Sequence, residues 1–197
     1  MFHEGDKLAF SNDNLVVKDA DGKVKLQCTC YRLFLVFAVG HTSITSVLIQ
    51  KAQKFGFFIA LMTPGFRLYS IIGTAKDGNT LLHRKQYLYE GLELAKVITT
   101  NKMKNQLYEM TTIRNKSEYV LESIAAVKSY IEKLPEVESL NELMAYEGLA
   151  SKVYFRSHFN NVPWKGRQPR IKKDYINSVM DIGYTLLFTF MDALLSC

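Results

Sequence analysis

The residue pattern of this chain changes near Gly78 and Asn79, and this change constrains the fold more than any other feature. Before it, short apolar runs alternate with turn-forming residues, and an Asp-Gly turn at residues 21–22 predicts a hairpin. After it, Gly and Pro become scarce and apolar residues recur every three or four positions, as in amphipathic helices. The sequence therefore predicts an α+β protein, with a small β-rich N-terminal domain over residues 1–80 and an all-helical domain over residues 81–197.

A strand, a helix and a second strand are predicted in the N-terminal part. The apolar runs 33–39 and 57–62 read as buried strands, and apolar residues at helical spacing lie between them. Thr42 or Ser43 is the expected N-cap of the helix, and Gly56 is expected to end it.

Three helices in the C-terminal part have recognisable starts. Ser117 precedes an apolar-periodic segment that ends before Pro135. Ser139 and Glu142 form a capping box, in which the two side chains satisfy free amide groups at the start of the next helix. A last, strongly apolar helix is expected to begin at Asp174.

Glu147 lies within an apolar stripe of the helix that follows Ser139. The stripe consists of Leu140, Leu143, Met144, Ala150, Val153 and Tyr154. This spacing directs the Glu147 carboxylate toward the interior and away from water. A carboxylate there carries a desolvation cost unless a cation or a hydrogen-bond network compensates it. A metal ion and a buried Arg or Lys partner are both open alternatives.

A basic stretch follows that helix. Residues 165–173 hold five positive charges and no acidic residue, and Gly166 and Pro169 favour a loop. The loop is either a solvated surface segment or an arm that binds phosphates with salt-sensitive affinity. Trp164, just before it, either stacks on a base or packs against the protein. The charged residues are Lys165, Arg167, Arg170, Lys172 and Lys173.

Charge and hydropathy narrow the classes of partner. The 25 Lys and Arg residues against 19 Asp and Glu give a net charge of +6, which favours an anionic partner, with nucleic acid first. The N-terminus lacks the pattern of a signal peptide, and no apolar run approaches the ~18–20 residues that span a bilayer. We therefore expect a cytoplasmic protein without a membrane partner. Phosphate-loop and Gly-x-Ser-x-Gly frames are also missing from the sequence.

Several short motifs occur in an order that resembles CRISPR-associated protein one, the spacer-acquisition integrase. The motifs are Gly40-His41-Thr42-Ser43-Ile44-Thr45, Leu82-His83-Arg84-Lys85-Gln86-Tyr87, Lys102-Met103-Lys104-Asn105-Gln106, Glu147-Gly148-Leu149-Ala150, Arg167-Gln168-Pro169-Arg170, Asn177 and Gly183-Tyr184-Thr185-Leu186-Leu187. The resemblance covers essentially the whole chain and looks closest to members from type V systems.

The resemblance implies a function and a set of residues. It implies an N-terminal dimerisation domain, a helical catalytic domain, and Glu147 as a catalytic ligand of Mg²⁺ or Mn²⁺. The candidate DNA-binding residues are Arg84, which lies in one of these motifs, and the basic stretch with Trp164. The implied reaction joins prespacer 3′-hydroxyl ends to repeat DNA of the CRISPR array by metal-dependent transesterification, with associated endonuclease activity. The implied assembly is a dimer or tetramer, with or without a companion adaptation protein.

One departure from the family leaves alternatives open. In the family, a His and one or more Asp that follow the Gly-Tyr segment complete the metal site, and this sequence ends before they would appear. Our leading hypothesis is a compact integrase whose site is completed by DNA phosphates, water, or a ligand such as His158 or Asp181. The alternatives are a truncated or catalytically incomplete copy that binds DNA or serves assembly, and a purely architectural role.

Overall fold

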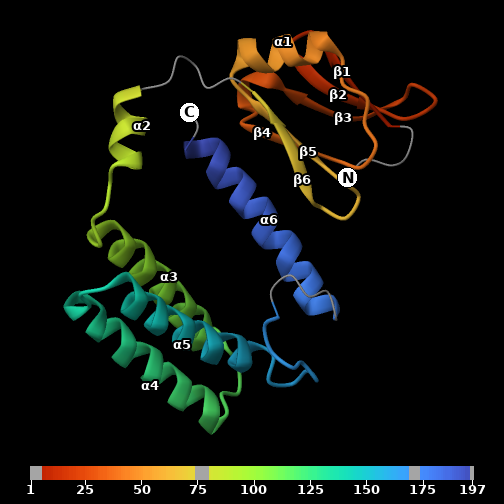
Figure 1. Ribbon diagram of the computed structural model, residues 1–197. Coiled ribbons are helices and arrows are strands. Elements are labelled where there is room, and N and C mark those ends of the chain that lie inside the picture. The colour runs from red at the N-terminus through yellow and green to blue at the C-terminus, as the bar shows by residue number, and fades with distance from the viewer. Residues whose placement is uncertain (1–5, 74–79, 169–173, 196–197) are drawn as a thin grey trace. The chain divides into compact units, whose positions relative to one another are not determined.

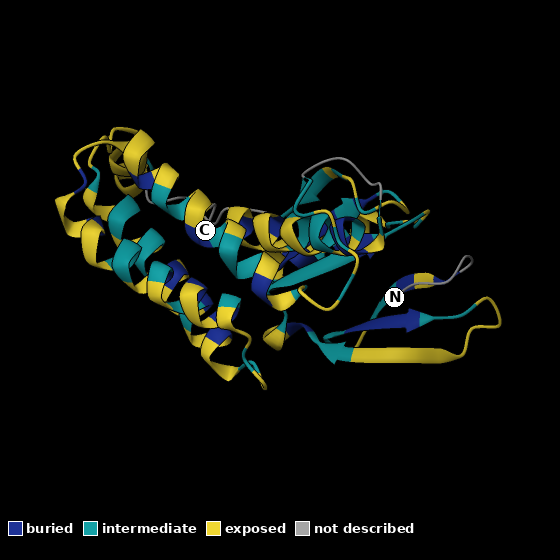
Figure 2. Ribbon diagram, turned by 90° about the horizontal axis from the view of Figure 1, so that it is seen from below, coloured by how far each residue is buried: buried dark blue, intermediate teal, exposed yellow. Residues whose placement is uncertain are grey.

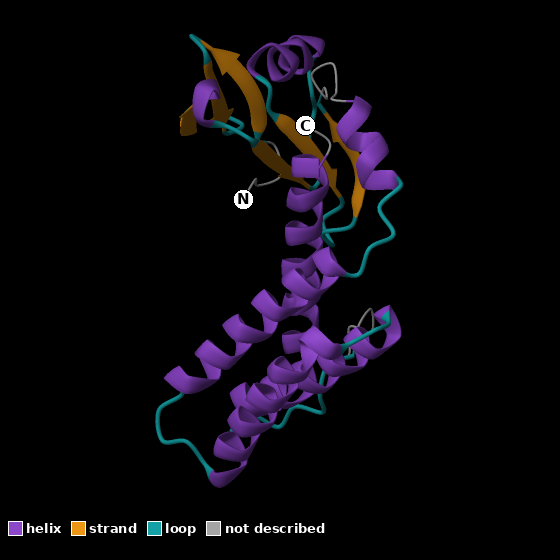
Figure 3. Cartoon of the chain, turned by 90° about the vertical axis from the view of Figure 1, so that its left-hand side faces the viewer, coloured by secondary structure: helices purple, strands orange, loops and turns teal. Residues whose placement is uncertain are grey.

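The computed structural model describes residues 6–73, 80–168 and 174–195. The chain divides into two compact units, Met1–Arg84 together with Ser178–Cys197, and Lys85–Asn177 (Figure 1). Strands gather in the first unit, whereas the second is built from helices (Figure 3). The α+β class predicted from the sequence is confirmed. The domain bounds 1–80 and 81–197 stay a prediction.

The N-terminal strands form an antiparallel sheet in the order β1-β2-β3. Lys18 pairs with Val24 across the turn, in which Gly22 has a φ of 82°. A positive φ is readily adopted by glycine, which has no Cβ to clash with the backbone. The hairpin predicted from the Asp-Gly pair is therefore confirmed. The strands are β1 (Lys7–Ser11), β2 (Asn14–Lys18) and β3 (Val24–Thr29).

A second sheet contains the predicted strand–helix–strand unit. β4 (Leu35–Val39) and β5 (Phe58–Met62) pair in parallel, α1 (Ser46–Phe55) connects them, and β6 (Leu68–Ile72) pairs antiparallel with β5. A short 3₁₀ helix, η1 (Cys30–Arg32), precedes this sheet.

The ends of α1 agree only in part with the sequence prediction. Gly56 ends the helix in the left-handed conformation, with a φ of 71°, as predicted. The N-cap is Thr45 and not Thr42 or Ser43, because the Thr45 hydroxyl accepts the hydrogen bond from the Leu48 amide at 3.2 Å. The helix thus begins later than expected, at the residue whose oxygen reaches a free amide.

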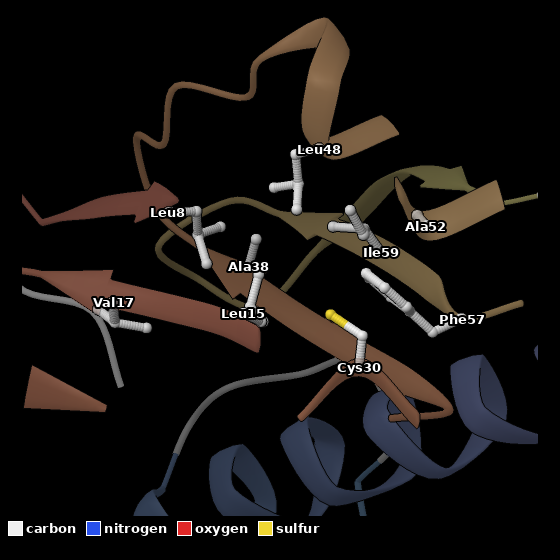
Figure 4. Packing of buried hydrophobic residues seen from close by; sticks show 9 residues of the cluster. All are labelled: Leu8, Leu15, Val17, Cys30, Ala38, Leu48, Ala52, Phe57 and Ile59. Carbon is white, nitrogen blue, oxygen red and sulfur yellow. The ribbon is translucent and has the colours of Figure 1, made fainter. Parts of the chain in front are cut away.

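The core of the first unit joins both sheets to α1. Leu48 and Ala52 of α1 are at most 1% exposed and pack with side chains of the two sheets. Figure 4 shows them beside Leu8, Leu15, Val17, Cys30, Ala38, Phe57 and Ile59.

Three long helices form the second unit. They are α3 (Glu93–Thr112), α4 (Glu118–Lys133) and α5 (Leu140–His158), and each packs against the other two. A 3₁₀ helix, η2 (Leu134–Glu136), follows α4, and α2 (Thr80–Tyr87) precedes α3. The shared core is Met103, Met110, Val127, Leu134, Val137, Leu143 and Ala150.

Serine side chains cap α4 and α5. Ser117 accepts the hydrogen bond of the Val120 amide at 3.4 Å, as predicted. Ser139 accepts that of the Glu142 amide at 3.2 Å. The Glu142 carboxylate accepts from the amide of Glu138 at 3.3 Å, one residue before the cap, so the predicted capping box is present in a shifted form.

The buried face of α5 differs in part from the predicted stripe. Leu143 and Ala150 are buried, and Glu147 lies between them in the sequence on the same face of the helix. Figure 2 shows that buried and exposed residues alternate along the helices. Leu140 and Met144 are 55% and 61% exposed, so their assignment to the buried stripe was wrong. The face that packs repeats every seven residues, and Met144 lies about 100° around the helix from Leu143.

The last helix, α6 (Tyr175–Leu195), is strongly apolar. By length and composition alone, this helix could cross a membrane, and it is the one such helix among the described residues. The mean hydropathy of its 18-residue window is 1.3. The sequence-based expectation that no apolar run reaches this length was therefore wrong. Core helices of soluble proteins that meet the same criterion are mostly buried, whereas 11% of the 18-residue window of this helix is buried. Phe190 of this helix packs edge-on against Phe34, with ring centroids 5.4 Å apart.

Neighbouring residues of α5 test this register. Leu143→Ala should lower the free energy of unfolding of the helical unit by about 2–5 kcal/mol, because it leaves a cavity in the core. Met144→Ala is the matched control and should change it by less than about 0.5 kcal/mol. Urea unfolding followed by circular dichroism measures both. Equal losses would contradict the register that places Glu147.

Candidate functional site

Glu147 lies at the contact between α5 and α3. Its Oε1 atom forms an ion pair with the Nζ atom of Lys102, which α3 supplies. The same oxygen accepts a hydrogen bond from the Ser151 hydroxyl, one turn further along α5, at 2.8 Å. Of the two open alternatives, the structure shows the basic partner, Lys102, and the metal ion stays a prediction.

A second polar contact continues this arrangement. Nε2 of Gln106, one turn after Lys102, donates to the Ser151 hydroxyl at 3.1 Å. Gln106 is 8% exposed, and its Oε1 atom is buried without a hydrogen-bond donor among the described residues. Lys102, Gln106, Glu147 and Ser151 therefore form a continuous polar chain between the two helices.

The Glu147 carboxylate is accessible to water. Its side chain is 31% exposed and that of Lys102 is 44% exposed. The expectation that the carboxylate faces the interior and not water was therefore wrong. The reason is geometric: Glu147 lies on the inward face, but the flank of the α3–α5 contact is open to solvent there.

The surroundings of Glu147 favour its charged form. Partial burial alone would raise its pKa, but hydrogen bonds from Lys102 and Ser151 and the positive charge of Lys102 outweigh that effect. The pKa of Glu147 accordingly lies below its ordinary value of 4.5. The carboxylate is therefore an anion at neutral pH.

The residues around Glu147 do not by themselves fit a divalent metal ion. Across residues 6–73, 80–168 and 174–195, no group of three or more His, Cys, Asp or Glu side chains is placed to hold one. His158 lies at the end of α5, where its ring packs against Tyr154, and Asp181 lies on α6 in the other unit. Mg²⁺ prefers near-octahedral oxygen coordination, which one carboxylate cannot supply. The metal at Glu147 stays a prediction.

A buried amide anchors the start of the basic stretch. Asn177 has no exposed surface. Its Oδ1 atom accepts from the Arg167 guanidinium at 3.1 Å and from the Gln168 amide at 2.9 Å. Its Nδ2 group donates to the Gly166 carbonyl at 3.1 Å and to the Asp174 carboxylate at 2.7 Å. One side chain therefore ties residues 166–168 to the beginning of α6.

Asp174 completes this anchor. Its Oδ1 atom accepts the Asn177 amide at 2.8 Å, so Asp174 acts as the N-cap of α6. Hydrogen bonds from the Asn177 backbone and side chain are the main reason that the pKa of Asp174 lies below its ordinary value. Sequence reasoning recognised the helix start but missed the anchor. The Asp-x-x-Asn spacing was the available signal.

The structure describes four of the predicted DNA-binding residues, Arg84, Trp164, Lys165 and Arg167. Lys165 is exposed, whereas Arg167 is partly buried. Trp164 packs against Phe155 and Phe159, with ring centroids 6.0 and 4.8 Å apart, so the structure shows the packing alternative. Arg84 is exposed near the end of α2 in the first unit. Arg170, Lys172 and Lys173 lie outside the described residues.

Comparison with known protein families identifies the family of this chain. The profile of the family "CRISPR associated protein Cas1" matches residues 1–196. The chain belongs to the Cas1 family. Its resemblance to type V members in particular stays a prediction.

The relatives of this Cas1 chain agree with that assignment. The CRISPR-associated endonuclease Cas1 1 of Francisella tularensis subsp. novicida is 24% identical over 196 residues, which are 93% of this chain and 61% of the relative. The chain thus spans about 61% of the length of this curated relative.

Solved structures share the fold. A Cas6-RT-Cas1–Cas2 complex matches with a TM-score of 0.74 and 18% identity, over 96% of this chain and 22% of that one. A casposase bound to integration product matches with a TM-score of 0.62 and 15% identity, over 93% of this chain and 56% of the casposase.

The charge of Glu147 should make stability depend on pH. Because its folded pKa lies below the ordinary 4.5, its contribution is present above about pH 4.5 and is lost as the pH falls through the folded pKa. Glu147→Gln should therefore cost up to about 1 kcal/mol of unfolding free energy at pH 7, and this difference should shrink in acid. Thermal unfolding from pH 7 to pH 3 measures it. Glu132→Gln, at an exposed position of α4, is the control; a difference independent of pH would contradict the ion pair.

The anchor predicts a large effect from a residue that carries no charge. Asn177→Ala should lower the free energy of unfolding by about 2–3 kcal/mol, because several buried hydrogen bonds lose their partner. In the same variant, hydrogen exchange at the Gln168 backbone amide should be faster than in the wild-type chain. Asn161→Ala, at an exposed position, should change neither measurement. Unchanged exchange at Gln168 in Asn177→Ala would show that the amide does not hold the loop.

Proposed function

We propose that this chain is an integrase and endonuclease of CRISPR adaptation, which joins the 3′-hydroxyl ends of a prespacer to repeat DNA by transesterification. The observation that carries the proposal is the Cas1 family match over residues 1–196. The curated relative is named an endonuclease, and one structural neighbour is a casposase bound to integration product. Both descriptions are consistent with an activity on DNA.

In this proposal Glu147 is the catalytic residue. Its carboxylate is charged, is held in place by two donors and is reachable from solvent. DNA is a polyanion and repels a carboxylate. A charged Glu147 can therefore act on DNA only if a positive charge lies between the carboxylate and the phosphates. The proposed cofactor is Mg²⁺ or Mn²⁺. Since the described residues do not make a metal site alone, further oxygen ligands are required from outside this set.

DNA binding is assigned to basic residues at the end of the helical unit and on α2. Lys165 and Arg167 precede Arg170, Lys172 and Lys173 in sequence, and Arg84 belongs to α2. Lysine and arginine release counterions when they pair with phosphates, so affinity from these residues should fall with salt.

Assembly and location complete the proposal. One neighbour is a complex that contains Cas2, which supports a companion adaptation protein as a partner. A homodimer or tetramer is proposed from the resemblance. A cytoplasmic location without a membrane partner stays a prediction of the sequence analysis.

A second candidate function is a DNA-binding and assembly subunit without catalysis. The observation that favours it is the Lys102–Glu147 ion pair, together with the missing ligand cluster among the described residues. This candidate predicts DNA binding that does not depend on Glu147.

A strand-transfer assay distinguishes the two candidates. Purified protein, Mg²⁺ or Mn²⁺, a short duplex with free 3′-hydroxyls and a supercoiled plasmid carrying the repeat should yield joined product. Glu147→Ala should abolish the product while the duplex is still bound. Product that survives Glu147→Ala would remove Glu147 from the mechanism, and binding without any product would favour the second candidate.

The same preparation tests the basic residues. Lys165→Gln, Lys172→Gln and Lys173→Gln combined should weaken duplex binding and reduce its salt dependence, by roughly one unit of log–log slope for each phosphate that is no longer neutralised. Lys128→Gln, Lys133→Gln and Lys152→Gln make the same change of charge at exposed helix positions and serve as the control. Equal effects of both triple variants would show that only net charge matters.

A further inference from the structure

Three aromatic rings of the first unit contact one another. Phe10 belongs to β1, Tyr31 to η1 and Phe55 to the last turn of α1. The Phe55 and Tyr31 rings pack edge to face with centroids 5.0 Å apart, and the Phe55 centroid is 6.0 Å from that of Phe10. Phe10 and Phe55 also pack against the buried core of this unit. The core therefore fixes the position of the ring that Tyr31 contacts.

Two lysines of α1 lie over these rings. The Nζ atom of Lys51 is 4.6 Å from the centroid of the Phe10 ring, and that of Lys54 is 5.5 Å from the centroid of the Phe55 ring. The negative face of an aromatic ring attracts an ammonium group, which keeps both charges close to the rings. We call the three rings and the two lysines the aromatic–lysine cluster.

The charges of the aromatic–lysine cluster are not neutralised within the chain. Lys51 and Lys54 form no ion pair with any carboxylate that the structure describes. Asp13 is a nearby carboxylate, since it and Lys51 both act electrostatically on the Cys30 thiol. One acidic group does not balance two ammonium groups, so this surface favours an anionic partner.

Packing of the unit accounts for only part of the cluster. The rings of Phe10 and Phe55 extend the core, and the lysine stems cover them, as long basic side chains do over apolar groups. Tyr31 differs from these rings, because it is 74% exposed and makes its ring contact with Phe55. It therefore presents a large flat ring to solvent beside two positive charges.

We propose that the aromatic–lysine cluster binds single-stranded nucleic acid, with an unpaired base stacked on Tyr31 and neighbouring phosphates paired with Lys51 and Lys54. Proteins that bind single strands combine aromatic platforms with basic groups that follow the backbone. A nucleic acid offers a flat ring beside every phosphate, whereas an acidic peptide offers charge alone. The inference goes beyond the proposed function, which assigns DNA contacts to the end of the helical unit and to α2. It requires neither a metal ion nor a chemical step, so it is tested separately from strand transfer.

Fluorescence anisotropy with the full chain tests the proposal. The probes are a labelled oligothymidine of about ten nucleotides, a length within the usual footprint of single-strand-binding sites, and an abasic strand of the same length and charge. Wild type should bind the oligothymidine more tightly than the abasic strand. Tyr31→Ala should weaken binding of the oligothymidine roughly tenfold, the scale of one lost base–aromatic contact, and leave binding of the abasic strand unchanged. Tyr31→Phe, which keeps the ring, should bind like wild type.

A second exposed tyrosine is the matched control. Tyr69 is 60% exposed on β6 of the same unit, and Tyr69→Ala should leave binding of both probes unchanged. Circular dichroism confirms that each variant is folded. Tyr31→Leu, which keeps an apolar contact with Phe55 but offers no ring, replaces Tyr31→Ala if the latter is not folded.

The two lysines are tested in the same assay. Lys51→Gln combined with Lys54→Gln should weaken binding of both probes and lower its salt dependence, because both strands carry phosphates. Lys128→Gln combined with Lys133→Gln removes the same charge at exposed positions of α4 and should have a smaller effect. Equal effects of the two double variants would reduce the role of the cluster to net charge and overturn the proposal.

Photocrosslinking locates the bound base. An oligothymidine with an iodinated uracil in place of one thymine is bound to the wild-type chain and irradiated, and the attachment site is mapped by mass spectrometry. Attachment to Tyr31 is expected, because a stacked aromatic ring is the group closest to the reactive base. Attachment only to residues outside the cluster would overturn the proposal.

The remaining outcomes also overturn it. Equal losses for both probes in Tyr31→Ala would show that the ring does not stack on a base. Displacement of the oligothymidine by polyglutamate as readily as by unlabelled oligothymidine would assign the surface to acidic proteins. Dissociation of a dimer by Tyr31→Ala in analytical ultracentrifugation would assign it to a second copy of the chain. Absence of oligothymidine binding in wild type would exclude the site outright.

Discussion

The packing of α3 against α5 is the contact on which the candidate site depends. Met103, Leu143 and Ala150 bury the apolar part of this contact, and it is their register that brings Glu147 to the edge of the interface. Polar partners then hold the carboxylate where the apolar packing leaves it. The packing of the helices thus sets the position of the Glu147 carboxylate, and Lys102 is the positive charge that pairs with it there.

Local signals in the sequence were sufficient for much of the fold. The caps Ser117 and Ser139 and the end of α1 at Gly56 were predicted because each depends on hydrogen bonds or a backbone angle within a few residues. The N-cap Thr45 was missed because several hydroxyl residues stand before α1, and only the geometry of the first turn selects one of them.

The partners of the site lay beyond such local signals. Lys102 is 45 residues from Glu147 in the sequence, and nothing in the spacing of either helix pairs them. Met144 was wrongly predicted to be in the core. Apolar spacing of three and four residues allows either side of the stripe to face the core, and only the packing of the three helices selects one side. The family resemblance named Glu147 but could not reveal its neighbour.

The anchor at Asn177 has a consequence for how the basic stretch meets a ligand. The buried side-chain amide of Asn177 holds residues 166–168 in one conformation. The conformational entropy of this segment is therefore already lost before an anion binds. An anion that approaches Arg167 encounters a preorganised surface, and ordering of that segment subtracts little from the affinity. A modest heat-capacity change on anion binding would be the thermodynamic mark of this preorganisation.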